Sequence, residues 1–355
     1  MCPVLTHPAS EGDGARMTVR SRILILVAAV AVLAVVGGAA VLHASARADR
    51  RNHTQAGGPR VTPGTVTLTG NGSMIFRNMA WGPHRDELTA VAAGDPSGPR
   101  TASGVKCLRF YAASGTGVCL QAVHGPVSDT YRALVLDDRL KVVHRYDVPG
   151  IPSRARVSPT GHFAAWTAFV GGDSYAGTNF STRAAIVDTR SGRLIPTLED
   201  FRIVKDGHPY QAADANFWGV TFARDDRTFY ATLATRGSTY LVRGDLRART
   251  VTTLHANVEC PSLSPDGTRI AYKKRVEGLS KDAPWRLYVL DLRTMRETPL
   301  AERRSVDDQA VWRDARTVVY ALPGDYGADL YQVPADGSGA PRRISTAAVS
   351  PAYIG

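Results

Sequence analysis

From Val66 onward the hydrophobic residues fall in short runs, many of them alternating with polar residues, and turn residues separate each run from the next. Alternation over four to eight residues is typical of a half-buried β-strand, and clusters of Gly, Pro, Asp and Ser between such runs mark turns. The pattern therefore predicts an all-β array over residues 65–355, and it excludes an all-helical protein.

The array repeats itself with a period of about 40 to 60 residues. The clearest unit, 260–300, reads as two strands around a Ser-Pro-Asp-Gly turn (CPSLSPDGTRIAYKKR) and, after a polar loop, two more strands (WRLYVLDLRTMRETPL). Pro265 fixes φ at a turn position and Gly267 permits a positive φ, so this tetrapeptide reverses the chain. The same plan recurs, with decreasing clarity, in four other segments: 154–198, 217–254, 107–148 and 309–345.

The two ends of the array complement each other. Residues 347–353 (AAVSPAY) read as an isolated first strand, while 74–80 and 88–100 read as the second and third strands of a unit that has no first strand. An inner strand left alone would expose a row of unpaired backbone N–H and C=O groups. We therefore predict a sixth unit that both ends of the chain build together.

The unit resembles the TolB-like β-propeller repeat, a relative of the WD repeat, whose hallmarks are a Ser-Pro-Asp-Gly turn, an Ala-Tyr strand and a later Leu-Tyr-Val-x-Asp strand. The match is strongest at 264–272 and 287–291, good at 158–161, and topological elsewhere. The resemblance covers nearly all of residues 66–355 and implies a six-bladed β-propeller of four-stranded blades. Such propellers are mostly binding platforms, although the same fold also accompanies hydrolases and lyases.

Ahead of the array, residues 23–42 form an apolar run of 20 residues without a charge. A helix of that length spans ~30 Å, the hydrocarbon thickness of a bilayer, so we predict a transmembrane or signal helix. Residues 1–22 are then a basic cytoplasmic tail, of which 1–16 are consistent with a misannotated start upstream of Met17. Arginines flank the run on both sides, so the positive-inside rule does not fix its orientation. They are Arg16, Arg20 and Arg22 before the run and Arg47, Arg50 and Arg51 after it.

Two interpretations of this segment stay open. The length of the apolar run favours an uncleaved single-pass anchor, whereas the small residues Ala44, Ser45 and Ala46 fit signal-peptide cleavage after Ala46. Both place the bulk of the chain outside the cytoplasm. Residues 43–64, which are small, polar and punctuated by Gly and Pro, predict a flexible linker to the propeller.

The composition removes one class of partner. The 355 residues carry a formal net charge of +11, and only six of the 43 basic residues are Lys, a usage typical of a high-G+C, actinobacterial-type genome. The charge is scattered, whereas nucleic-acid binders concentrate it on one face or helix. We therefore predict no nucleic-acid partner.

The cysteines of the exported part, Cys107, Cys119 and Cys260, are disulfide candidates outside the cytoplasm. Cys107 and Cys119 are nearest in sequence, but a hairpin turning at 114–117 would set Cys119 opposite Ala112, so a bridge between them requires an irregular loop. The sequence contains no Cys-x-x-Cys pair and no His at ligand spacing, so we predict no metal site and no cofactor.

Two loops are longer than turn chemistry requires, 171–183 and 199–218, and a propeller would open both on the face that carries its B-to-C and D-to-A connections. Their side chains suit peptide or glycan contacts, or they hydrogen-bond one another to hold the loops; both interpretations stay open. The candidate binding residues are Asp173, Ser174, Tyr175, Asn179, Arg183, Asp206, His208, Tyr210, Asp214, Asn216 and Trp218.

We assign no catalytic residue. The segment 172–176 approaches a nucleophile elbow, but Ala176 stands where the second Gly belongs and the context is a β-array. The pair Asp225-Asp226 is explained by a turn, and Asp307-Asp308 has no companion residues in the sequence.

The sequence therefore predicts a non-catalytic protein-binding or scaffold module at the bacterial cell envelope, held at the membrane by its N-terminal helix, with envelope proteins or cell-wall polymers as partners. The alternative is an extracytoplasmic propeller enzyme, a glycan or peptide hydrolase or a lyase, with its site near the 171–183 loop.

Overall fold

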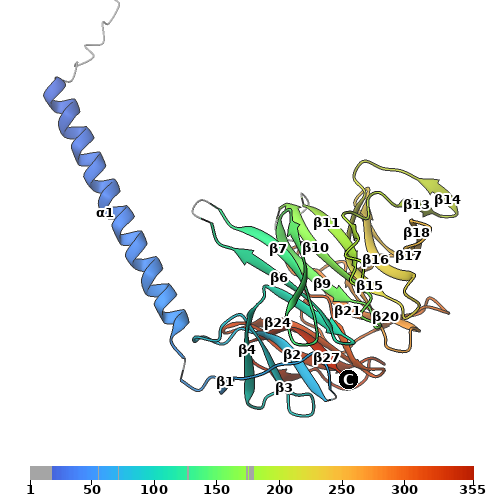
Figure 1. Ribbon diagram of the computed structural model, residues 1–355. Coiled ribbons are helices and arrows are strands. Elements are labelled where there is room, and N and C mark those ends of the chain that lie inside the picture. The colour runs from blue at the N-terminus through green and yellow to red at the C-terminus, as the bar shows by residue number, and fades with distance from the viewer. Residues whose placement is uncertain (1–17, 55, 71, 126–127, 173–174, 176–179) are drawn as a thin grey trace, which may run out of the picture. The chain divides into compact units, whose positions relative to one another are not determined.

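The computed structural model describes residues 18–54, 56–70, 72–125, 128–172, 175 and 180–355. The chain divides into two compact units, 1–53 and 54–355 (Figure 1). The first unit is a helix and the second is a ring of β-sheets, and each is described by itself.

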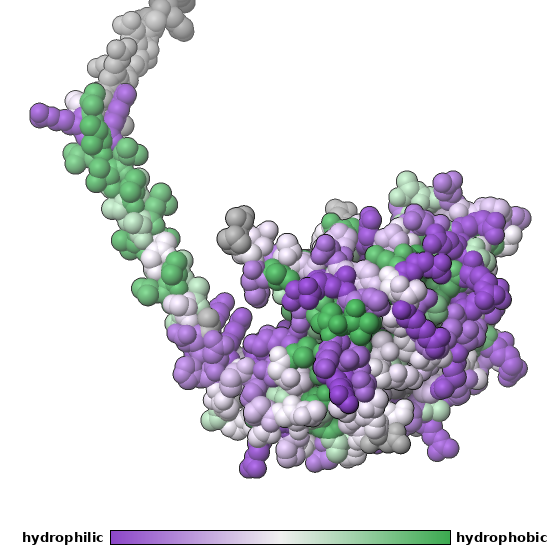
Figure 2. Space-filling view, viewed as in Figure 1, coloured by the Kyte–Doolittle hydropathy of each residue, from purple (hydrophilic) through white to green (hydrophobic). Residues whose placement is uncertain are grey.

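Helix α1 (Val19–Asn52) is long and apolar enough to cross a membrane. Thr18 caps its N-terminus, and Figure 2 shows a hydrophobic band along the helix with hydrophilic residues at both of its ends. The helix continues ten residues past position 42, into the segment for which the sequence predicts a linker. Good helix formers such as Ala44, Ala46 and Arg47 explain this extension, and Arg50 and Arg51 suit the negative end of the helix dipole.

The second unit is a six-bladed β-propeller, as predicted. Each blade is an antiparallel sheet that starts at the central axis, and the inner strands β5, β9, β15, β19, β23 and β27 contact one another around the ring. Blade 1 contains β5 (Arg109–Ala113), β6 (Thr116–Val123), β7 (Thr130–Leu136) and β8 (Val142–Val148); blade 2 contains β9 (Ile151–Val157), β10 (Phe163–Gly171), β11 (Ser181–Asp188) and β12 (Leu194–Ile195). Blade 3 contains β15 (Asn216–Phe222), β16 (Thr228–Thr235), β17 (Ser238–Asp245) and β18 (Thr250–Ala256); blade 4 contains β19 (Glu259–Leu263), β20 (Arg269–Arg275), β21 (Trp285–Asp291) and β22 (Glu297–Pro299). Blade 5 contains β23 (Val311–Asp314), β24 (Thr317–Gly324), β25 (Gly327–Pro334) and β26 (Arg342–Ser345); blade 6 contains β27 (Ala348–Ile354), β2 (Ser73–Asn78), β3 (Glu87–Ala92) and β4 (Arg100–Lys106).

Blade 6 closes the ring with both ends of the array, which confirms the predicted sixth unit. Its inner strand β27 pairs antiparallel with β2. The buried Arg100 of β4 reinforces this closure by donating hydrogen bonds to Asn78 (2.6 Å), to the hydroxyl of Ser345 (3.1 Å) and to the carbonyl of Ala347 (3.1 Å). The short strand β1 (Val61–Pro63), from the end of the predicted linker, adds in parallel to the outer edge of β4.

The Ser-Pro-Asp-Gly sequence forms the predicted turn between β19 and β20. Asp266 accepts hydrogen bonds from the Ser264 hydroxyl (2.5 Å) and the backbone N–H of Thr268 (3.0 Å), and Gly267 has a φ of 73°. A side chain at Gly267 would be strained at this φ, which is why the turn needs glycine there. In blade 3, Asp225 accepts the equivalent bond from the backbone N–H of Arg227 (3.0 Å).

The hairpin of blade 1 differs from the prediction. Ala113 pairs with Thr116, so the turn contains only Ser114 and Gly115, both with positive φ, and Cys119 lies opposite Phe110 rather than Ala112. Two positive φ values are typical of the tight type I′ turn, which is two residues shorter than the predicted turn at 114–117. The tighter turn brings Cys119 toward the connection that precedes β5, and Cys107 and Cys119 form a disulfide with Cα atoms 5.4 Å apart. Cys260 is a buried thiol.

Candidate functional site

The propeller has two different faces. One, here called the loop face, carries the connections that enter each inner strand and the loops between second and third strands; the other, the turn face, carries the Ser-Pro-Asp-Gly-type turns. The candidate residues that the structure describes do not form one group. Asp173, Ser174 and Asn179 lie outside the described residues.

Tyr175 and Trp218 do come together. Their ring centroids are 5.3 Å apart, and both are buried in an aromatic cluster with Phe169, Phe180 and Trp285 beside the central axis. The Tyr175 hydroxyl and the Ser153 hydroxyl share a hydrogen bond of 2.6 Å. Burial raises the pKa of Tyr175, so the phenol stays neutral.

Other predicted residues hold the 199–218 connection in place. Part of this connection forms a hairpin, β13 (Arg202–Lys205) and β14 (His208–Tyr210), and β13 pairs in parallel with β18 on the outer edge of blade 3. The hydroxyl of Thr235 bonds both Tyr210 (2.8 Å) and Asp214 (2.8 Å).

The remaining predicted residues are dispersed. Asn216 accepts from the N–H of Thr182 (2.9 Å) at the start of β15. Asp206 lies at the hairpin turn with a φ of 53°, His208 is exposed on the outer strand, and Arg183 lines a lateral groove of about 690 Å³ between blades 1 and 2. Among the predicted residues that the structure describes, only Tyr175 and Trp218 therefore meet at the axis.

A network of charges that the sequence did not reveal surrounds Tyr175. We call it the channel cluster, and it consists of Arg109, Arg154, Glu259, Lys273, Asp307 and Asp308. Lys273 is fully buried; its ammonium lies 3.8 Å from Glu259, bonds Asp307, and lies 4.7 Å from the centre of the Tyr175 ring. Glu259 is equally buried and also pairs with Arg275 (2.7 Å).

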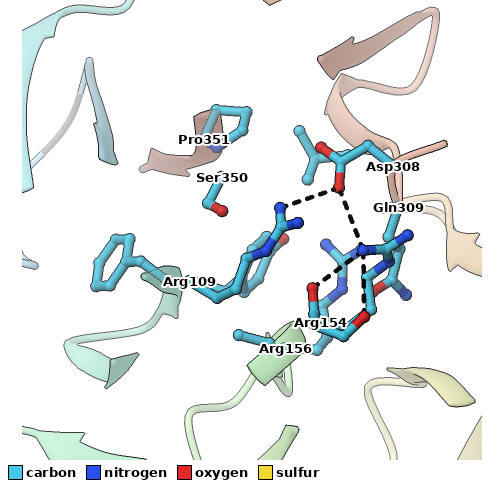
Figure 3. Close-up of a pocket in the computed structure, with 12 residues that line it drawn as sticks. Arg109, Arg154, Arg156, Asp308, Gln309, Ser350 and Pro351 are labelled. Atoms are coloured by element: carbon cyan, nitrogen blue, oxygen red, sulfur yellow. Dashed lines mark hydrogen bonds and ion pairs between the residues drawn. The ribbon is translucent and has the colours of Figure 1, made fainter. Parts of the chain in front are cut away.

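Asp308 draws the two arginines of the channel cluster together. It lies 3.5 Å from Arg109 and 4.0 Å from Arg154, and Figure 3 shows both guanidinium groups turned toward its carboxylate. Arg154 also reaches Asp307 (3.5 Å). The companions of the Asp307-Asp308 pair thus come from blades 1, 2 and 4, up to about 200 residues away in sequence.

Side chains bridge the channel between opposite blades. Arg154 and Arg156 of blade 2 donate to the carbonyls of Asp307 (3.0 Å) and Ala310 (3.1 Å), at the entrance to blade 5. Gln309 donates to the carbonyls of Val220 (3.2 Å) and Pro261 (2.7 Å) in blades 3 and 4. Together with the channel cluster, these contacts cross-link the blades near the loop face.

The opposite end of the channel is open. At the turn face, the ends of all six inner strands line an axial cavity of about 620 Å³. Its lining combines aromatic and charged side chains, among them Tyr111, Arg156, Phe222, Arg224, Asp266, Trp312, Arg313, Asp314 and Tyr353. The axial cavity therefore lies on the turn face, opposite to the loop face on which the site was predicted.

Comparison with known proteins supports the fold and goes no further. No family model and no curated protein matches the chain. Among solved structures, TolB from Acinetobacter baumannii is similar with a TM-score of 0.55 and 17% identity over 80% of this chain and 66% of that chain. A chain of the nidogen/laminin complex is similar with a TM-score of 0.52 and 8% identity over 80% of this chain and 98% of that one.

A puromycin-hydrolysing peptidase of Mycobacterium tuberculosis also matches, with a TM-score of 0.46 and 15% identity over 82% of this chain and 47% of that one. The chain thus spans less than two thirds of the length of TolB and about half that of the peptidase. At these identities the similarity defines a fold: the second unit is a TolB-like six-bladed β-propeller.

Proposed function

We propose that this protein is a non-catalytic protein-binding module that works outside the cytoplasm at the bacterial cell envelope. The observation that carries the proposal is the axial cavity on the turn face. A cavity of about 620 Å³ framed by six rigid inner strands, with aromatic rings beside arginines, has the composition of a recognition surface for a protein segment.

Two further observations support this function. The loop face, where the competing enzyme hypothesis places its site, has its axial carboxylates Asp307 and Asp308 paired with cationic side chains. A chain of the nidogen/laminin complex, which joins two proteins, shares the fold. The apolar helix α1 supports attachment to a membrane as a single-pass anchor, with secretion after cleavage near Ala46 as the alternative.

The decisive experiment compares two charge-reversal variants of the full chain. Arg224→Glu with Arg313→Glu alters the rim of the axial cavity, and Arg202→Glu with Arg342→Glu alters exposed outer edges as a matched control. We expect a purified envelope partner, identified by cross-linking in the membrane, to bind the wild type and the control equally and the cavity variant at least tenfold more weakly. Equal binding by both variants would contradict the proposal, and binding of isolated cell-wall polymer instead would redirect it.

A second assay addresses catalysis. The full chain is incubated with peptidoglycan and with a peptide library, beside the variants Ser174→Ala, His208→Ala and Asp214→Ala. We expect no turnover by any of them. Turnover by the wild type that disappears in one variant would establish the enzyme alternative.

The mass of the mature protein from membranes distinguishes an intact anchor from cleavage after Ala46.

A further inference from the structure

A small space lies at the axis where four blades meet. It has a volume of about 20 Å³, which is enough for one species the size of a water molecule or slightly larger. Arg109 of β5, Arg154 and Arg156 of β9, Asp308 at the entrance to β23 and Ser350 of β27 line it. Figure 3 shows these side chains converging from their separate strands.

The charges around this space do not balance. Three guanidinium groups line it, but Asp308 is the one carboxylate among its described lining residues. The neighbouring carboxylates are already shared, because Asp307 bonds Lys273 as well as Arg154. Burial lowers the pKa of Arg109, the charge of Asp308 opposes this shift, and the charge of Arg154 adds to it.

Two buried donors point to a missing acceptor. Arg154 and Arg156 are each only 5% exposed, and the Nε–H group of each has no hydrogen-bond partner among the described residues. Arg156 is held by the carbonyl of Ala310 and by the ring of Tyr111, 4.3 Å from its guanidinium carbon, and no carboxylate contacts it in the described part of the chain. A buried cation and an unpaired buried N–H are both costly, and an anion between them would relieve both costs.

We propose that this space binds one monovalent inorganic anion of the size of chloride, held by Arg109, Arg154 and Arg156. The volume excludes a larger ligand such as a nucleotide or a peptide, and the three guanidinium groups supply charge and donors. Tyr111 and Arg156 also line the axial cavity, so the anion exchanges through the turn face. The ion ties blades 1 and 2 together, independently of any protein partner.

The first test measures thermal unfolding of the full chain in detergent while chloride replaces gluconate at constant ionic strength. Binding to the folded state alone raises the midpoint by about 2 °C for each tenfold increase in chloride above its dissociation constant, for a ring of this size. We expect this slope in the wild type and in the control Arg202→Gln, on the exposed outer edge of blade 3, and its loss in Arg156→Gln. A midpoint that ignores the identity of the anion, or an Arg156→Gln variant that keeps the slope, would overturn the proposal.

A second variant keeps the test valid if Arg156→Gln fails to fold. Asp308→Asn removes the carboxylate that competes with the anion, so chloride should act at concentrations at least tenfold lower than in the wild type. An Asp308→Asn variant that responds to chloride only at the concentrations that the wild type needs would contradict the proposal.

A crystal grown in bromide provides the direct readout. We expect an anomalous peak between the three arginines at bromide concentrations that also shift the unfolding midpoint. A site that is empty under those conditions contradicts the proposal. So does a peak without any shift in solution, which marks an adventitious ion only.

Discussion

The two ends of the central channel are built from the same six inner strands, yet they treat charge in opposite ways. At the loop face, Lys273 and Glu259 are fully buried and are paired within the channel cluster. At the turn face, Arg224 and Asp314 are exposed around an open cavity. Charges without water must find partners of opposite sign, while hydrated ones stay available to a ligand. In the proposed function, the loop-face end of the ring holds the blades together and the turn-face end recognises a partner.

The largest expected difference between the two ends comes from removing one carboxylate at each. Glu259→Gln leaves Lys273 and Arg275 short of a counter-charge at the loop face, and losing one partner of a buried pair costs about 3–5 kcal/mol. Asp314→Asn makes the same chemical change at the open end, where we expect a cost within about 0.5 kcal/mol. Denaturant unfolding of both full-length variants at pH 7 measures the difference. Equal losses would mean that the two ends contribute alike to stability.

The second largest effect is expected from removing the disulfide. Cys107–Cys119 fastens the entrance to blade 1 beside Arg109, at the loop face. The double variant Cys107→Ala with Cys119→Ala should lower the unfolding free energy by about 3 kcal/mol, as expected for a bridge closing a loop of this length. Reductant should destabilise the wild type by the same amount and leave the variant unaffected. Hydrogen exchange should increase at 107–110 more than at 112–116, and the reverse pattern would contradict this account.

The smallest effect belongs to the turn face and depends on pH. Burial alone would raise the pKa of Asp266, but hydrogen bonds from Ser264 and Thr268 lower it to about 2. In the unfolded chain an Asp titrates near ~4, so the ionised turn stabilises the fold above about pH 4, and this contribution is lost as the pH falls toward 2. Unfolding midpoints measured from pH 5 to pH 2 should fall less steeply in Asp266→Asn than in the wild type. Identical profiles would show that the turn does not depend on this charge.

Most of the fold could be predicted because its signals are local. A Ser-Pro-Asp-Gly turn is four consecutive residues, and the pairing of β27 with β2 follows from complementary remnants at the two ends of the array. The register of the blade 1 hairpin was missed because Ser114 gives no obvious sign that it adopts a positive φ. One unexpected turn shortened the loop and brought the two cysteines within bonding distance.

The channel cluster could not be predicted in the same way, since its members come from four blades and only the closed ring brings them together. One signal was present: Arg154 and Arg156 alternate within an inner strand, where both faces are normally buried and charged residues are unusual. The sequence predicted the site on the long loops instead, but Tyr210 and Asp214 mainly fix the connection to the outer edge of blade 3.

The place of β1 has a mechanical consequence. The chain enters the ring through this strand, which meets the outer edge of β4 over three residue pairs, whereas the closure of the ring lies at the inner edge of the same blade. A force pulling along the chain from the helix would therefore peel β1 away first. Detaching β1 would release residues 61–65, roughly 17 Å of extended chain. Further extension would have to expose Val66 and Leu68, which are buried. This segment can therefore lengthen under tension while the six-bladed ring stays closed.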